Sequence, residues 1–153
     1  MQISAKRFGE LSAAELYEIL RARAAVFVVE QKCAYQDIDG RDLEAVHVVA
    51  RGEDGELAGY LRVMRGEDGR AWIGRVLALR RRQGVATRLL REGLEVAGEV
   101  FGARRVCLEA QTYARGLYEK AGFVQTSEQF LEDGIPHVRM EKVILGGKGA
   151  GGA

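Results

Sequence analysis

The sequence has little of several features that mark particular classes of protein. Its two cysteines, Cys33 and Cys107, lie far apart without metal-ligand spacing, which favours reduced thiols of an intracellular protein over a single disulfide bridge. Basic residues exceed acidic ones by only 23 to 22, so no basic excess is present for binding nucleic acid over a wide face. No apolar run approaches the roughly 20 residues that span a membrane, and the N-terminus has no apolar signal-peptide centre. These absences predict a cytoplasmic protein whose partners include neither nucleic acid nor membrane.

The chain length and the distribution of glycine predict one domain. A chain of 153 residues is long enough to bury a core, and its length is typical of a single domain. Neither an internal linker nor a repeat divides it. The last stretch, "GGKGAGGA", is too rich in glycine to pack. We therefore expect a single domain over residues 1–145 and a flexible tail over residues 146–153.

The N-terminal part predicts a strand followed by a helix. Residues 2–8 alternate weakly between apolar and polar side chains, which favours a first strand. The stretch "SAAE" (Ser12–Glu15) places a glutamate three residues after a hydroxyl cap, and this capping box starts a helix. The polar segment 30–43 then predicts an exposed loop. Apolar spacing predicts the buried face of the helix: Leu16, Ile19, Leu20, Val26 and Phe27.

Three short β-rich runs follow, "AVHVVAR", "LAGYLRVMRG" and "AWIGRVLAL", joined by "GEDGE" and "GEDG". Asp-Gly between such runs is a strong hairpin signal, so residues 45–79 predict an antiparallel three-stranded meander. A long helix is expected from about residue 84 to 101, ended by Gly102. Its predicted apolar face consists of Val85, Leu89, Leu90, Leu94, Ala97 and Phe101.

The C-terminal part predicts a buried strand at "RVCLEA", a second helix and a final pair of strands. The helix is expected over 112–121, capped by Thr112 and ended by Gly122, and the strands over about 123–131 and 137–145. A strand that feeds a helix and returns as a strand implies a right-handed crossover and a parallel pair. The fold class is therefore α/β, with a mixed, mostly antiparallel central sheet and helices on both faces.

The turn before the long helix carries an unusual charge pattern. In "LALRRRQGVATRLLREGL" (Leu77–Leu94), three arginines and a glycine precede the helix, and its first turn contains no acid. Helix starts normally attract negative charge, and ligands of open α/β sheets bind at this edge. Gly84 would let a phosphate approach the unpaired amides, so the turn predicts a pyrophosphate site, with a solvated surface turn as the alternative. Neither G-x-G-x-x-G nor G-x-x-x-x-G-K-[ST] is present, which argues against the two common nucleotide loops.

Several segments resemble one protein family. "RRQGVA" (Arg81–Ala86) is similar to the [QR]-x-x-G-x-[GA] loop of the GNAT superfamily of acetyl-CoA-dependent N-acetyltransferases. "ARGLYEKAGF" (Ala114–Phe123) resembles the second signature of that superfamily. "RAAVFVVEQKCAYQDIDGRD" (Arg23–Asp42) and "FLEDGIPHVRM" (Phe130–Met140) further resemble its ElaA-type branch. The resemblance covers about residues 8–143.

The resemblance implies the GNAT fold and acetyl-CoA as co-substrate, without a metal. The loop that cradles the CoA pyrophosphate corresponds to Arg81, Arg82, Gln83, Gly84, Val85 and Ala86. The family splays the preceding strand away from "RVCLEA" and pairs its backbone with the pantetheine arm of the cofactor. The corresponding residues here are Val76, Leu77 and Leu79. Gln111 stands where many relatives have an asparagine that contacts the cofactor, and this departure leaves its role open.

The same resemblance assigns acid catalysis to Tyr118, which would protonate the departing CoA thiolate, although a tyrosine on this helix face also packs well. Many relatives carry a glutamate that acts as the general base on the strand before the loop, but "AWIGRVLAL" contains no acid. Glu30, after the apolar end of the first helix, and His47, on the second strand, are the favoured candidates for the general base. His137 and Glu109 are weaker candidates, and an ordinary surface or capping role is the alternative for each.

The acidic stretch "EQKCAYQDIDGRD" would attract a cationic amine if it bordered the cleft, and an exposed polar loop is the alternative. A calcium loop is excluded, because Gly40 falls fourth from Asp37 and the twelfth residue is Val48. Two functions follow. The first is an N-acetyltransferase that moves an acetyl group from acetyl-CoA to a primary amine of a small molecule or protein by direct attack. The second is a CoA-binding sensor or interaction module without turnover. A free strand edge near the C-terminus leaves a homodimer open.

Overall fold

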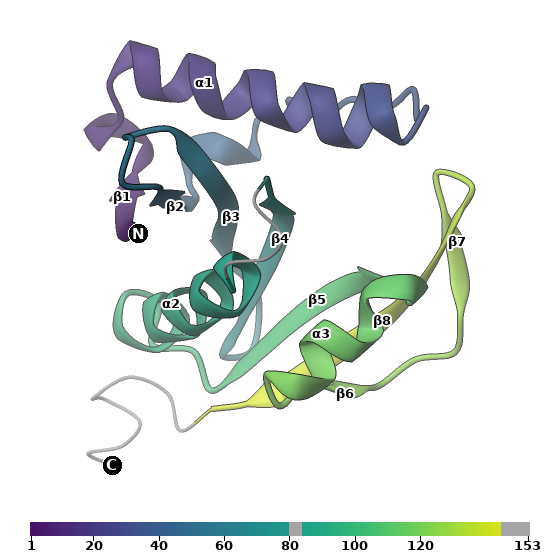
Figure 1. Cartoon of the computed structure of the whole chain (residues 1–153). Helices are drawn as coiled ribbons and strands as arrows, with labels where there is room; N and C mark the ends of the chain where they lie inside the picture. Colours follow the sequence, from purple (N-terminus) through teal and green to yellow (C-terminus); the bar gives the residue numbers. More distant parts are fainter. Residues whose placement is uncertain (80–83, 145–153) are drawn as a thin grey trace.

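The structure, a computed structural model, describes residues 1–79 and 84–144 of the chain (Figure 1). The predicted cofactor contacts Arg81, Arg82 and Gln83 lie outside the described residues. The strands are β1 (Gln2–Arg7), β2 (Val46–Arg51), β3 (Leu57–Arg65), β4 (Arg70–Ala78), β5 (Arg105–Gln111), β6 (Val124–Gln125), β7 (Phe130–Glu132) and β8 (Ile135–Val143). The helices are η1 (Phe8–Glu10), α1 (Ala13–Arg23), the π-helix η2 (Ala24–Glu30), η3 (Arg41–Leu43), α2 (Val85–Glu99), η5 (Thr112–Ala114) and α3 (Arg115–Lys120).

The described strands form one sheet in the order β1-β2-β3-β4-β5-β8-β6, and β7 also pairs with β8. Neighbouring strands are antiparallel except β4 and β5, which run parallel. The helix α2 connects these two strands, as a crossover requires. The predicted mixed, mostly antiparallel α/β sheet is therefore confirmed, as is the meander formed by β2, β3 and β4.

Helices cover both faces of the sheet, with α1 on one face and α2 on the other (Figure 1). Successive side chains of a strand point to opposite faces. On β2 and β3, Val49 and Tyr60 therefore pack with Ile19 of α1 in one apolar cluster. The neighbouring residues Val48 and Leu61 belong to the larger cluster that contains the buried side chains of α2. The core thus consists of two layers separated by the sheet.

The capping box at the start of α1 is confirmed. The Glu15 amide donates to the Ser12 hydroxyl at 3.0 Å, and the Ser12 amide donates to the Glu15 carboxylate at 2.9 Å. The predicted buried face is confirmed only in part. Ile19 is fully buried, and so is Arg23, which was not predicted to be buried. The remaining apolar residues of the prediction are only partly buried: Leu16, Leu20, Val26 and Phe27.

The helix α2 packs closely on β3. Its predicted apolar face is confirmed for Val85, Leu89, Leu90 and Ala97, which are buried. Leu94 is only partly buried, and the partly buried Phe101 follows the end of the helix. The absence of a side chain at Gly59 permits this approach. A Cβ there would lie 2.6 Å from Val85 Cγ1 and 2.7 Å from Leu89 Cδ1, which is closer than real Cβ contacts. The close approach fixes the first turn of α2 against the end of β4, which pairs with β3.

The predicted helix over 112–121 is shorter in the structure. A 3-10 turn over Thr112–Ala114 precedes α3, which ends before Gly122. Thr112 does not cap the helix, because the turn begins at Thr112 itself and Gln111 occupies the cap position.

The predicted strand over 123–131 was wrong as a single strand, because it divides into β6 and β7. Between them, the Ser127 hydroxyl accepts a hydrogen bond from the Arg139 amide at 2.9 Å. The Ser127 carbonyl accepts one from the Gln125 side chain at 2.8 Å. These two bonds, one to β8 and one within the segment, take the place of the regular ladder at this point.

The two cysteines are both free and buried, which confirms the expectation of unpaired thiols. Among the described residues, no helix is long and apolar enough to cross a membrane.

Candidate active site

The strands β4 and β5 form a wedge. They pair only where Arg70–Trp72 faces Arg105–Cys107, and beyond these residues they separate. The cause lies in β4, where the register against β3 shifts next to Arg75, a non-glycine residue with a φ of +52°. A bulge of this kind bends a strand and increases its twist. The expected splaying is thus built into the backbone of β4.

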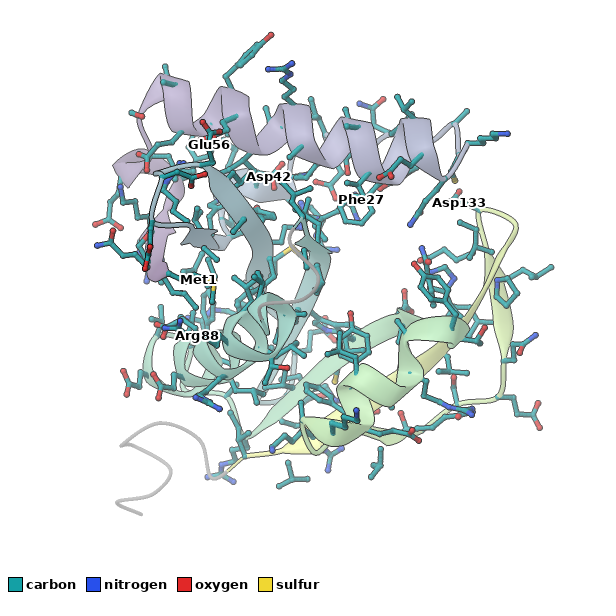
Figure 2. The ribbon with its side chains drawn as sticks, in the orientation of Figure 1. Met1, Phe27, Asp42, Glu56, Arg88 and Asp133 are labelled. Carbon is teal, nitrogen blue, oxygen red and sulfur yellow. The ribbon has the colours of Figure 1, made fainter. Side chains whose placement is uncertain are left out.

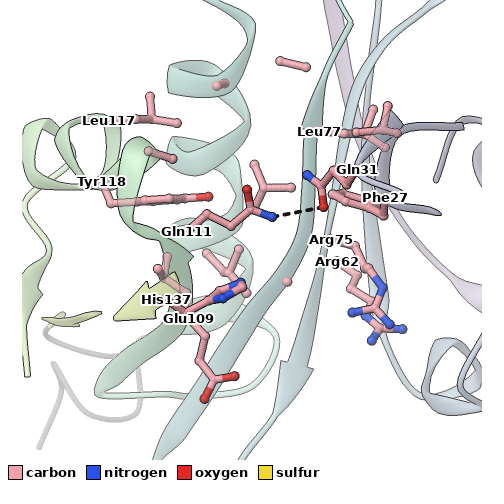
Figure 3. Close-up of a pocket in the computed structure, with 18 of the residues that line it drawn as sticks. Phe27, Gln31, Arg62, Arg75, Leu77, Glu109, Gln111, Leu117, Tyr118 and His137 are labelled. Atoms are coloured by element: carbon pink, nitrogen blue, oxygen red, sulfur yellow. Dashed lines mark hydrogen bonds between the residues drawn. The ribbon is translucent and has the colours of Figure 1, made fainter. Parts of the chain in front are cut away.

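A cavity of about 700 Å³ occupies this wedge, and residues of β4, β5, α2, α3 and the turn after β7 line it (Figure 3). This volume is within the usual range for a ligand pocket, about 300–1,000 Å³. At one end the cavity reaches the first turn of α2, where Gly84, Val85, Ala86 and Thr87 line it. Gly84 has a left-handed backbone with a φ of +63°, and no side chain caps the helix.

The first turn of α2 lines the cavity with residues whose amides have no acceptor within the helix. The first intrahelical bond runs from the Arg88 amide to the Gly84 carbonyl at 3.1 Å, so the amides before Arg88 have no helical acceptor. The first turn of α2 contains no acidic residue. Unpaired amides and the helix dipole together make an anion site. The predicted positions Gly84, Val85 and Ala86 therefore line the cavity at the uncapped start of α2.

The predicted pantetheine contacts differ in position. Val76 and Leu77 line the cavity, and Leu79 does not. Leu79 is exposed, and its amide donates to the Ala58 carbonyl at 2.7 Å. Val76 has no register partner on β3, so its backbone belongs to the part of β4 that is free to pair with a ligand.

Tyr118 lies on α3 and lines the cavity (Figure 3). Its side chain is buried, and its ring packs edge-on against Phe123 with 6.2 Å between centroids. Burial, with a smaller contribution from Tyr113, raises the pKa of Tyr118 to about 12. Among the described residues, no hydrogen-bond acceptor or donor contacts its hydroxyl. Tyr118 therefore combines the packing role with a protonated hydroxyl that is available to a ligand.

Gln111 ends β5 and spans the wedge. Its side-chain amide donates to the Gln31 side chain at 3.1 Å, which joins β5 to the segment after η2 (Figure 3). Its register partner on β8 is His137. The two side chains therefore lie next to each other at the same part of the cavity.

Four residues at this part of the cavity form what we call the His137 edge: Glu109, Glu132, Asp133 and His137. The His137 ring is buried, and its Nδ1 donates to the Ile135 carbonyl at 2.7 Å. Its Nε2 lies 3.8 Å from a Glu132 carboxylate oxygen. Burial, followed by the nearby Glu109 carboxylate, raises the pKa of Glu132 above its ordinary value.

The two favoured base candidates do not line the cavity. Glu30 is exposed at the end of η2. His47 is fully buried, where its Nδ1 accepts from the Tyr60 hydroxyl at 2.6 Å and its Nε2 donates to the Asp42 carbonyl at 2.9 Å. Burial lowers the pKa of His47. The geometry thus gives His47 a role in holding the backbone at Asp42 rather than a role in the cavity.

The acidic segment is a loop with mostly exposed residues, as the alternative expected, but two of its acids are buried. Asp37 and Asp42 are buried and contact arginines from α1, β3 and β4. We call this group of six side chains the ion network: Arg23, Arg62, Arg75, Asp37, Asp39 and Asp42. Because these acids already face arginines, they do not offer free negative charge to a cationic substrate.

The ion network is tightly connected. Arg23 contacts Asp37 at 3.1 Å and Asp42 at 2.7 Å. Arg62 contacts Asp39 at 2.6 Å and Asp42 at 2.8 Å. Burial alone would raise the pKa of Asp42, but the hydrogen bonds from Arg23 and Arg62 outweigh it and lower that pKa. Sequence reasoning missed this network, although the position of Arg23 four residues after Ile19 on the buried face of α1 was a usable signal.

The donor chemistry of the described residues does not include a metal site, since no group of three or more His, Cys, Asp or Glu side chains among them could hold an ion.

Comparison with known proteins agrees with this geometry. The acetyltransferase (GNAT) domain family matches residues 11–144. Protein ElaA of Escherichia coli is 38% identical over 142 residues, which covers 89% of this chain and 92% of ElaA. A UPF0039 protein of Schizosaccharomyces pombe is 40% identical over 138 residues, covering 88% and 92% of the two chains.

Solved structures show the same fold. The crystal structure of Escherichia coli ElaA matches with a TM-score of 0.85 and 36% identity, covering 93% of this chain and 99% of that one. The structure of an acyl-CoA N-acyltransferase from Pseudomonas aeruginosa also matches with a TM-score of 0.85 and 37% identity, covering 94% and 100%. The wedge, the uncapped start of α2 and these similarities lead to one conclusion. The chain belongs to the GNAT acetyltransferase family, is of the ElaA type, and is an acyltransferase.

Proposed function

We propose that this acyl-CoA N-acyltransferase moves an acetyl group from acetyl-CoA to a primary amine of a small molecule or protein by direct attack. One observation carries the proposal. The wedge between β4 and β5 leads from Tyr118 and Gln111 to the unpaired amides at the start of α2. A long thioester with a diphosphate at one end fits this arrangement.

The diphosphate would accept hydrogen bonds from the amides that follow Gly84. Charge-assisted hydrogen bonds contribute roughly 1.5–3 kcal/mol each. The loop arginines Arg81 and Arg82, and Gln83, complete the proposed diphosphate site. The pantetheine arm would pair with the backbone near Val76 and Leu77, as an added strand pairs with a sheet edge.

The reaction forms a C–N bond and breaks a C–S bond. The neutral amine attacks the thioester carbonyl carbon, and the sulfur leaves with the proton of the Tyr118 hydroxyl. A hydroxyl with a pKa of about 12 keeps its proton at neutral pH and is therefore a donor there. A thiolate with a solution pKa of about 8.5 leaves tolerably without help, so Tyr118 accelerates the reaction without being indispensable.

A CoA-binding sensor without turnover is the competing function, and it is favoured by the absence of an acid on β4. Incubation of the protein with acetyl-CoA and a panel of primary amines, with assays for free CoA thiol and for the acetylated amine, separates the two. We expect thiol release that depends on the amine and matches acetylamine formation one to one. Binding of acetyl-CoA without either product would support the sensor and contradict the enzyme.

We further propose a cytoplasmic site of action and one catalytic domain over residues 1–145. The free thiols of Cys33 and Cys107 fit a reducing compartment. A homodimer through a free strand edge stays a prediction, which sedimentation of the purified protein would test.

A further inference from the structure

We propose that His137 is the general base, which accepts a proton from the acceptor amine at Nε2, and that Glu132 stabilises the resulting imidazolium. This inference rests on the proposed amine acetylation and names the base for it. A base is needed because about one lysine-type amine in 2,500 is neutral at pH 7. The strand β4, "RAWIGRVLA", supplies no acid for this purpose.

The hydrogen bond at Nδ1 fixes the tautomer of His137. A carbonyl oxygen only accepts, so the 2.7 Å contact with the Ile135 carbonyl places the proton of the neutral ring on Nδ1. The lone pair is then on Nε2. Among the described residues, no hydrogen-bond donor contacts Nε2, and the side chain, which is only 9% exposed, lines the cavity. A buried imidazole with a free lone pair toward a ligand cavity is the arrangement that a general base requires.

The ring is also held in orientation. The Phe130 ring stacks on it, with centroids 6.0 Å apart and planes inclined by 22°. Both residues belong to the β7–β8 hairpin, where they are register partners. The imidazole therefore has its position set by one hydrogen bond and one ring contact on the same rigid element.

Acidic side chains and one arginine lie in the part of the structure around His137. Glu132 on β7 lies 3.8 Å from Nε2, and the Asp133 carboxylate follows in the turn. Glu109 on β5 lies close enough to Glu132 to raise the pKa of that residue, and it contacts Arg139 of β8 at 4.0 Å. Three acids thus line the cavity together with His137, and they attract an ammonium group to this part of it.

The position of His137 suits the reaction. In Figure 3 the side chain of Gln111 lies between those of Tyr118 and His137, and all three border the same cavity. The proton acceptor and the proton donor therefore approach the thioester from two sides. Nε2 takes one proton from the ammonium, and the freed lone pair forms the C–N bond. The second amine proton, acidic once that bond has formed, restores Tyr118, and His137 releases its proton to water.

The test is the pH dependence of kcat/KM for acetyl transfer by wild type and His137→Gln. We expect His137→Gln to lower kcat about 100-fold or more at pH 7 and to lose the imidazole-type acid limb of the profile. The affinity for CoA should stay within about twofold, which also shows that the variant is folded. Added imidazole should restore part of the rate of His137→Ala. The surface variant Glu128→Gln serves as the matched control and should behave as wild type.

A second variant, Glu132→Gln, leaves the buried His137 ring in place. Because the Glu132 carboxylate favours imidazolium, Glu132→Gln should move the acid limb to lower pH with little effect on CoA affinity. If His137→Gln turned over as fast as the wild type, or if the acid limb did not move in Glu132→Gln, the assignment of His137 as the base would be overturned. The proposed acetyl transfer would still stand. Binding of acetyl-CoA without turnover by the wild type would overturn the proposed function, and the assignment with it.

Discussion

The ion network and the His137 edge both consist of charged side chains beside the cavity, but they differ in how their charges are matched. In the ion network, Arg23 is fully buried and each of its two aspartate partners also contacts a second arginine. Among the described residues, one buried side-chain nitrogen, Arg62 Nε, lacks a hydrogen-bond partner. In the His137 edge, Nε2 has no such partner in the described part of the chain. Charges that neutralise one another hold the backbone, and charges left toward a cavity are available for chemistry.

The two histidines show the same difference at the level of single atoms. Both nitrogens of His47 are engaged within the protein, by Tyr60 and by the Asp42 carbonyl (Figure 2 labels Asp42). His137 lines the cavity and has one nitrogen engaged by the backbone, whereas its other nitrogen has no hydrogen-bond partner among the described residues. The sequence alone does not distinguish them, because both lie on strands between apolar neighbours.

The largest expected effect comes from breaking the ion network. Arg23→Ala leaves Asp37 and Asp42 buried without their shared arginine, so we expect a loss of about 3–5 kcal/mol in the free energy of unfolding. Denaturant unfolding measures it. The half-exposed pair of Glu18 and Arg51, 2.8 Å apart, gives the matched control, since Glu18→Gln should change stability by less than about 1 kcal/mol. A loss below 1 kcal/mol in Arg23→Ala would contradict the structural role of the network.

Among the cavity-lining groups without a partner in the described part of the chain, Tyr118→Phe should lower kcat about 100-fold, while the free energy of unfolding changes by less than about 1 kcal/mol. The hydroxyl has no partner among the described residues, so its loss removes a proton donor and leaves the packing of the ring. Steady-state kinetics and denaturant unfolding check the two halves. The exposed Tyr17→Phe is the control and should change neither. Unaltered turnover in Tyr118→Phe would remove the residue from the mechanism.

Gly59→Ala tests whether the close packing of β3 on α2 positions the cofactor site. The new Cβ would lie 2.9 Å from the Leu77 carbonyl oxygen as well as close to Val85 and Leu89, so the backbone must shift. We expect a loss of about 1–3 kcal/mol in stability, together with weaker CoA binding. Gly116→Ala, where the Cβ meets nothing within 4 Å, is the matched control. Equal stability of the two variants would show that the packing is less strict.

The smallest effect is the pH dependence of stability that His47 introduces. Burial lowers its pKa in the folded state, whereas the unfolded side chain takes up a proton near pH 6.5. The contribution of His47 is therefore fully present above pH 6.5 and is lost as the pH falls toward the folded pKa. We expect a decrease of up to about 1 kcal/mol between pH 7 and about pH 5.5, measured by denaturant unfolding. His47→Gln should have a flatter profile over that range, and an equally steep one would contradict this cause.

Much of the fold was predictable from local patterns. The meander β2–β4 and the helix α2 follow from Asp-Gly turns and regular apolar spacing, and both are confirmed. The division between β6 and β7 was not predictable, because it depends on Ser127 meeting Arg139 of another strand. Thr112 is a residue type that often caps helices, but the chain enters a 3-10 turn at this residue.

The site was predictable only in part, and for a physical reason. The uncapped start of α2 at Gly84 is a local feature of the sequence, and the wedge and Tyr118 came from the resemblance to the family. The His137 edge joins side chains of β5, β7 and β8, whose proximity depends on the pairing of those strands. Likewise, the burial of Arg23 was not predicted, because an arginine on a helix is normally taken as exposed. The aspartates that neutralise it lie in the segment after the helix.

Titration calorimetry of coenzyme A against the wild type and Gly84→Glu tests the central claim most directly, with Gly102→Glu as the control. Gly102 has the same φ of +63° and the same open surroundings, but it lies beyond the other end of α2. We expect one CoA site in the wild type and in Gly102→Glu, and an affinity at least tenfold weaker in Gly84→Glu, because the new carboxylate faces the diphosphate site. Absence of CoA binding by the wild type, or equal affinity in Gly84→Glu, would contradict a diphosphate site at the start of α2.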